Sequence, residues 1–124
     1  MITRSDADAV AHPSIDSRDR LIFALDVPDA DTARRTVAAL GDSVQFYKLG
    51  LELAMSPEYF GLIDELTATG RKVFADLKLY DIPATVAAAV RRLNGRGIHF
   101  VTVHGDRAIM EAAADAAVDV NILA

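Results

Sequence analysis

The sequence contains no cysteine, so disulfides, thiolate zinc sites and a cysteine nucleophile are excluded. No stretch reaches the roughly 18 apolar residues that a membrane helix needs, and the polar, acidic first 20 residues lack the apolar core of a signal peptide. There is no polybasic tract, and the net charge of −5 argues against a nucleic-acid partner. We therefore expect a soluble, cytoplasmic protein that binds neither membranes nor nucleic acid, with a flexible tail over residues 1–20.

The common nucleotide-binding and metal-binding motifs are also missing. No Walker loop and no HExxH helix is present. The turn that follows the first apolar run, VPDAD, has none of the glycines of a dinucleotide fingerprint, and Gly95-Arg96-Gly97 precedes a predicted strand instead of following one. These absences exclude a Rossmann-type nucleotide site.

What remains is an alternation of short apolar runs and helix-like segments in a chain of 124 residues that is 52% hydrophobic and 25% charged. The apolar runs carry hydrophobic residues on both faces, as parallel strands covered by helices do. The βα unit recurs four times over one predicted domain, 21–124, which fits either an open doubly wound sheet or part of a (βα)8 barrel. Strands are predicted at 21–26, 44–49, 72–77, 98–104 and from 119 onward; helices are predicted at 31–40, from 56 to about 70, at 83–93 and at 106–117.

Charged and polar residues gather where four consecutive predicted strands end. These residues are Asp26, Lys48, Asp76 with Lys78, and His104. Because side chains alternate along a strand, Asp76 and Lys78 should point to the same face. Counting back by twos gives that face an otherwise mainly apolar set: Ile22, Ala24, Val44, Phe46, Phe74, Phe100 and Thr102. An apolar interior with charges at the carboxyl ends of the strands favours the barrel.

Each of these charges, taken alone, also has an ordinary structural interpretation. Asp76 could cap a turn, and Lys78 could be its surface ion-pair partner, worth about 0–1 kcal/mol. His99 has the opposite parity to Phe100, so we expect it to face the helices and to be structural. The structural interpretation does not account for polar groups at the same end of four successive strands.

The segment from Phe74 to Thr85, FADLKLYDIPAT, resembles the DxKxxDIPxT signature of the orotidine 5′-phosphate decarboxylase family. The stretches LD at 25–26, FYKLG at 46–50 and VTVH at 101–104 resemble that family's first, second and fourth strand ends at fitting spacings. A bare DxKxxD is also shared by related sugar-phosphate decarboxylases and synthases. The continuation through Ile82, Pro83 and Thr85, with Lys48 upstream, is more specific.

The resemblance implies a charge array of two lysines and two aspartates. Lys78 would be the proton donor, Asp76 would lie beside the substrate carboxylate, and Lys48 would contact the ribose and join the network. Asp81 would complete the array from across a subunit boundary, which implies a homodimer with shared active sites. The implied substrate is the nucleotide orotidine 5′-phosphate, decarboxylated to UMP without metal or cofactor.

The remaining implied contacts lie around this array. Asp26 would bind a ribose hydroxyl or support the lysines, and Thr85 would reach into the partner subunit's site. Ile82 would belong to the substrate-binding set, and His104 would lie near the site without an assigned chemical step.

The chemistry explains why such residue types are needed. Loss of CO2 from C6 of the pyrimidine leaves a vinyl carbanion with no adjacent carbonyl to absorb the charge. An ammonium between two carboxylates is favoured in its charged form, and it can stabilise the carbanion and then protonate it.

A (βα)8 barrel usually needs about 250 residues, or about 200 at the small end, so we expect this chain to hold only four βα units and the start of a fifth strand. The family's later phosphate-gripping loops and arginine would then lie outside it. Two alternatives remain open. One is a sister sugar-phosphate decarboxylase or synthase, which usually needs a divalent metal; the other is a non-catalytic half-barrel.

Overall fold

The computed structural model describes residues 14–124, so residues 1–13 of the predicted tail lie outside the described part. Between residues 14 and 20 there is one 3-10 turn, η1 (Ser17–Asp19). It is tied to the rest of the fold, because Lys72 Nζ lies 2.6 Å from Asp19 Oδ2 and Arg18 donates to the Asp42 carbonyl at 3.0 Å.

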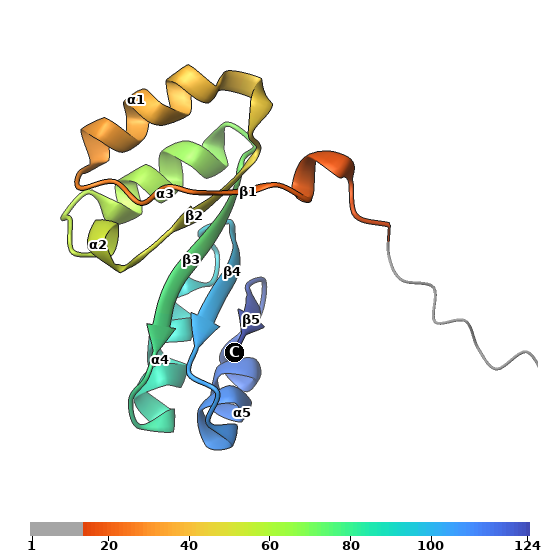
Figure 1. The fold of residues 1–124 in the computed structure, drawn as a ribbon. Helices are drawn as coiled ribbons and strands as arrows, with labels where there is room; N and C mark the ends of the chain where they lie inside the picture. Colours follow the sequence, from red (N-terminus) through yellow and green to blue (C-terminus); the bar gives the residue numbers. More distant parts are fainter. Residues whose placement is uncertain (1–13) are drawn as a thin grey trace, which may run out of the picture.

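The centre of the fold is one parallel sheet in which the strands follow their order in the chain, β1-β2-β3-β4-β5 (Figure 1). Each strand pairs in parallel with the next, and a parallel pair needs a crossover connection. Since crossovers are right-handed, a sequential order brings all helices to one face of the sheet, as in a (βα)8 barrel. The strands are β1 (Ile22–Ala24), β2 (Phe46–Leu49), β3 (Lys72–Leu79), β4 (Ile98–Val103) and β5 (Asn121–Leu123).

Three helices, α1, α4 and α5, begin at residues that suit a helix start. Asp29 accepts from Thr32 N at the start of α1, Pro83 occupies the first turn of α4, and Asp106 accepts from Ala108 N and Ile109 N at the start of α5. The helices are α1 (Ala30–Leu40), α2 (Leu51–Ala54), α3 (Tyr59–Ala68), α4 (Pro83–Leu93) and α5 (Arg107–Ala116), with a 3-10 turn η2 (Gly41–Ser43) after α1. None of the helices in residues 14–124 is long and apolar enough to cross a bilayer.

The hydrophobic core lies between the sheet and these helices. The strand side chains that point toward the helices are fully or almost fully buried, which fixes the register of the sheet because a one-residue slip would expose them all. They include Tyr47, Leu49, Val73, Ala75, Val101 and Val103, and Leu25, directly after β1, is buried with them.

The opposite, inner face carries an aromatic cluster. Phe46 stacks on Phe100 at 5.7 Å between ring centroids, Phe74 meets Phe100 edge-on at 5.9 Å, and Phe46 is only 2% exposed. The predicted apolar inner face is therefore confirmed for Phe46, Phe74 and Phe100, and their rings shield one another in part. The prediction is wrong for Val44, which precedes β2 and is buried in the core cluster with Tyr47 and Leu49, because regular strand alternation begins only at Phe46.

The prediction for His99 is wrong. Its ring lies edge-on to Phe46, with 5.4 Å between centroids, on the inner face. The register between β3 and β4 shifts here, since Val73 pairs with Ile98 while the adjacent Phe74 pairs with Phe100. An extra residue in one strand breaks simple alternation, so His99 and Phe100 both reach the inner face.

Candidate active site

Two lysines from neighbouring strands converge on one carboxylate at the carboxyl end of the sheet. Lys78 Nζ lies 2.7 Å from Asp76 Oδ2 within β3, and Lys48 Nζ of β2 lies 3.7 Å from the same oxygen. The prediction that Asp76 and Lys78 share a face is confirmed by this contact. Lys48, Asp76 and Lys78, which lie near the ends of two neighbouring strands, thus form a compact Lys–Asp–Lys group.

The solvent exposure of the three side chains increases from Asp76 through Lys48 to Lys78. The Asp76 side chain is 12% exposed, that of Lys48 27% and that of Lys78 64%. Burial by itself raises the pKa of the Asp76 carboxyl, but hydrogen bonds from Lys78 and Thr102 and the charges of both lysines outweigh it. The pKa of Asp76 is therefore held below its ordinary value, and the carboxylate stays ionised between two ammonium groups.

Thr102 is a member of this site that the sequence reasoning counted only as part of the inner face. Its hydroxyl donates to Asp76 Oδ1 at 2.7 Å and accepts from the backbone N–H of Lys78 at 3.0 Å. Since Phe74 pairs with Phe100, the residues two positions further along, Asp76 and Thr102, lie side by side. The sequence did offer a signal for this contact: Thr102 is a hydroxyl residue at the inner-face position that lies across from Asp76 on the neighbouring strand.

Asp26 and His104 lie at the same end of the sheet but outside the Lys–Asp–Lys group. Asp26 follows β1 and lies beside the turn after β2, where a Cβ on Gly50 would be 3.6 Å from Asp26 Oδ1. The His104 ring stacks on Tyr80 with 4.3 Å between centroids, and its backbone N–H donates to Leu79 O at 2.9 Å. Within residues 14–124, neither side chain forms an ion pair with Lys48 or Lys78.

The residues after β3 form an exposed turn. Asp81 Oδ1 accepts from the backbone N–H of Ile82 at 2.6 Å, at the start of α4. Tyr80 is 71% exposed and Ile82 69% exposed, and Thr85 is exposed one turn into α4. Asp81, Ile82 and Thr85 thus lie at the surface of this chain, where Asp81 and Thr85 line a hollow of about 260 Å³ beside Leu79 and Tyr80.

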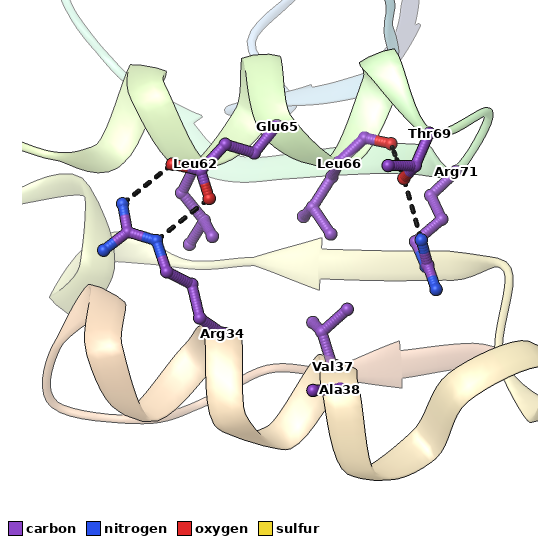
Figure 2. A pocket seen from close by; sticks show the side chains of 8 residues that line it. All are labelled: Arg34, Val37, Ala38, Leu62, Glu65, Leu66, Thr69 and Arg71. Carbon is purple, nitrogen blue, oxygen red and sulfur yellow. Dashed lines mark hydrogen bonds and ion pairs between the residues drawn. The ribbon is translucent and has the colours of Figure 1, made fainter.

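Two other hollows lack this chemistry. One, of about 280 Å³, lies in the outer layer between α1 and α3, where Arg34 pairs with Glu65 (Figure 2). Asp31 and Glu58 also pair with Arg34, so its charge is neutralised. The other, of about 740 Å³, lies at the amino ends of the strands beside the inner-face aromatic rings. Sites in α/β barrels lie at the carboxyl ends of the strands, where Asp76 and Lys78 are.

Across residues 14–124 no group of three or more His, Asp or Glu side chains is arranged to hold a metal ion.

The model of the orotidine 5′-phosphate decarboxylase / HUMPS family matches residues 19–123. The chain belongs to this family. It is 56% identical over 106 residues to an orotidine 5′-phosphate decarboxylase from Methylococcus capsulatus, covering 86% of this chain and 44% of that protein. It is 52% identical over 108 residues to one from Stenotrophomonas maltophilia, covering 86% and 45%. The chain thus spans less than half the length of these relatives.

Solved structures of the family have the same fold over this region. An orotidine 5′-phosphate decarboxylase from Lactobacillus acidophilus matches with a TM-score of 0.71 and 32% identity, over 82% of this chain and 50% of that one. The Methanocaldococcus jannaschii enzyme in complex with the inhibitor BMP matches with a TM-score of 0.68 and 31% identity, over 77% and 45%. The prediction of a TIM-barrel fold with four βα units and a fifth strand is confirmed.

Proposed function

We propose that this chain supplies the lysine–aspartate part of an active site that decarboxylates orotidine 5′-phosphate to UMP in pyrimidine biosynthesis. The observation that carries the proposal is the placement of Lys78 Nζ 2.7 Å from Asp76 Oδ2, with Lys48 at 3.7 Å, at the carboxyl end of a barrel sheet. The names of the relatives that are 51–56% identical support the choice of substrate.

In the proposed reaction Lys78 is the proton donor. As CO2 leaves C6, the electron pair of the breaking C–C bond remains on C6, and the Lys78 ammonium stabilises this charge and then gives a proton to C6. Asp76 lies beside the departing carboxylate, and Lys48 holds the ribose and completes the network. Charges fixed on adjacent strand ends need little reorganisation during the reaction. The proposed step uses no metal and no cofactor.

The other predicted residues bind substrate in this proposal. Asp26 binds a ribose hydroxyl, and His104 lines the site next to Tyr80. Asp81, Ile82 and Thr85 act in the site of a partner subunit within a homodimer. The exposure of the turn after β3, with Ile82 69% exposed, supports a role at a subunit boundary. The absence of cysteine supports a reducing compartment, the cytoplasm.

The test uses a completed barrel, in which residues 1–124 are continued by the carboxyl-terminal part of the Methylococcus capsulatus relative. UMP formation from orotidine 5′-phosphate is followed by the change in pyrimidine absorbance, with and without EDTA. We expect turnover that EDTA leaves unchanged. A folded completed barrel that is inactive on this nucleotide, or that becomes active on a sugar phosphate only with a divalent metal, would contradict the proposal and favour the sister enzymes of the family.

A further inference from the structure

Thr102 links β4 to the part of β3 that carries Asp76 and Lys78. It lies on β4, whereas Asp76 and Lys78 lie on β3. Its single hydroxyl makes two contacts with different roles: it donates to Asp76 Oδ1 at 2.7 Å and accepts from Lys78 N at 3.0 Å. Both the proton and a lone pair of the hydroxyl are therefore used, and each contact ends on a residue of the proposed charge array.

The contact to the Lys78 amide compensates for an irregular backbone. Lys78 is the one non-glycine residue with positive φ in residues 14–124, at 47°, a conformation that L-residues adopt at a cost. The register between β3 and β4 shifts between Ala75 and Leu79, so the regular ladder is interrupted at Lys78. The Thr102 hydroxyl gives the Lys78 N–H an acceptor there, and an unpaired N–H would be unfavourable.

The contact to Asp76 determines which carboxylate oxygen faces the lysines. Oδ1 is occupied by Thr102, and Oδ2 is the atom that both Lys78 and Lys48 approach. A carboxylate held at one oxygen keeps a fixed rotation about its terminal bond, which otherwise is a broad torsion. Threonine suits this task because its β-branched side chain has few rotamers.

We infer that Thr102 is a positioning residue for the reaction, which orients the Asp76 carboxylate and holds the Lys78 backbone so that the ammonium of Lys78 meets C6. The inference rests on the proposed function. In this inference Thr102 contacts neither Lys78 Nζ nor C6 of the pyrimidine, the atoms between which the proton moves. It acts through the Asp76 carboxylate and the Lys78 backbone.

The experiment compares Thr102→Val, which keeps the shape but removes the hydroxyl, with Thr102→Ser, which keeps the hydroxyl. In the completed barrel we expect Thr102→Val to lower kcat by about 10- to 100-fold while KM changes by less than about threefold. Thr102→Ser should stay within about threefold of the parent kcat. Thr36→Val is the matched control, because the Thr36 hydroxyl only donates to Thr32 O within α1.

The pH profile separates positioning from mere loss of packing. Thr102 favours the ionised form of Asp76, so removing the hydroxyl should raise the pKa of Asp76. The acid limb of the kcat profile should therefore move to higher pH in Thr102→Val and not in Thr102→Ser or Thr36→Val. Carbon-13 NMR titration of the Asp76 carboxyl in the same proteins should show the same order.

The outcomes distinguish this inference from the proposed function. An inactive parent contradicts the proposed function, and the Asp76 titration still decides the role of Thr102. Parent-like kcat and parent-like Asp76 titration in Thr102→Val overturn the inference, as does a loss in Thr102→Ser equal to that in Thr102→Val. If far-UV circular dichroism shows that Thr102→Val is unfolded, Thr102→Ala makes the same comparison with a smaller side chain.

Discussion

Lys78 Nζ lies 2.7 Å from Asp76 Oδ2, and both residues lie in the carboxyl-terminal half of one strand, β3. The pair is thus formed by local strand geometry within a single chain. Because Asp76 is nearly buried and Lys78 is 64% exposed, the ammonium is held at the boundary where a substrate could reach it. This relationship makes Lys78 the first residue to test.

We expect Lys78→Ala to lower decarboxylation by the completed barrel by several orders of magnitude, with the fold retained. The variant removes the proposed proton donor and the charge that stabilises the carbanion, and each such contribution is typically worth a factor of about 10² to 10⁴. Steady-state assays give the rate, and far-UV circular dichroism checks the fold.

Lys72→Ala is the matched control for Lys78→Ala. Lys72 stands at the opposite end of β3, where its ammonium pairs with Asp19 at 2.6 Å. Its loss should leave kcat within about threefold of the parent value, because the site lies at the other end of the strand. Near-normal turnover in Lys78→Ala would remove Lys78 from the role of proton donor.

The second prediction concerns acid. The pKa of Asp76 is lowered in the folded protein, so its ionised form stabilises the fold at pH values above the ordinary carboxyl pKa of about 3.9. This contribution is lost as the pH falls through the lower, folded pKa. Asp76→Asn should therefore lower the free energy of unfolding by about 1–3 kcal/mol at pH 7, and the difference should shrink below about pH 4.

Urea unfolding of the completed barrel at several pH values measures this difference. Asp31→Asn is the control, since the Asp31 carboxylate is 77% exposed in its pair with Arg34 and should contribute less than about 1 kcal/mol. A difference for Asp76→Asn that does not depend on pH would show that the carboxylate charge is not what stabilises the fold.

The sequence predicted the elements best where local signals agree with the tertiary fold. The helix at 83–93 has the bounds of α4, because Pro83 suits the first turn and Asn94 ends the helix in an extended conformation. The placement of Lys48 and Asp76 near the carboxyl ends of β2 and β3 was also predictable, since charges that follow apolar runs mark the edge of a covered sheet. The short helix α2 (Leu51–Ala54) was not predicted, because four residues are too few to show a helical period.

The errors on the inner face of the sheet arise from irregular strands. Alternation assigned His99 to the helix face, but the register shift beside Val73 turns it to the inner face. Alternation also gave no sign that Lys78 has φ of 47° or that its N–H depends on Thr102. Bulges and side-chain acceptors depend on how two strands meet, and a period of two within one strand cannot express that.

The third prediction concerns subunits. We expect the completed barrel to be a homodimer in which Asp81 of one subunit completes the site of the other. Lys78→Ala and Asp81→Ala homodimers should each be nearly inactive. In a mixed dimer one site carries both changes and the other carries neither, so mixing should restore up to about half of the parent activity per mixed dimer.

Subunit exchange must be shown in the same sample, for example by native mass spectrometry of differently labelled chains. Mixing Lys78→Ala with a labelled Lys78→Ala protein is the control and should restore nothing. Proven exchange without recovered activity would contradict a shared site.

The last prediction concerns the 124-residue polypeptide by itself, which we expect to be self-associated and essentially inactive. In the described part of the chain β1 pairs only with β2 and β5 only with β4, so the outer edges of both strands are free to pair with another molecule. Ile22 is 39% exposed and Leu123 37% exposed on these edge strands, and the hollow beside Phe46 and Phe100 is open on the inner face. In the proposed function, none of the residues assigned to the site within 14–124 binds the phosphate of the substrate. Binding energy from such a remote part of the substrate normally helps to lower the activation barrier of the reaction. Light scattering on the purified polypeptide gives its mass, and a UMP assay gives its activity, with the completed barrel as the control. A folded monomer that turns over orotidine 5′-phosphate at a rate near that of the completed barrel would show that these edges and the missing contacts matter little.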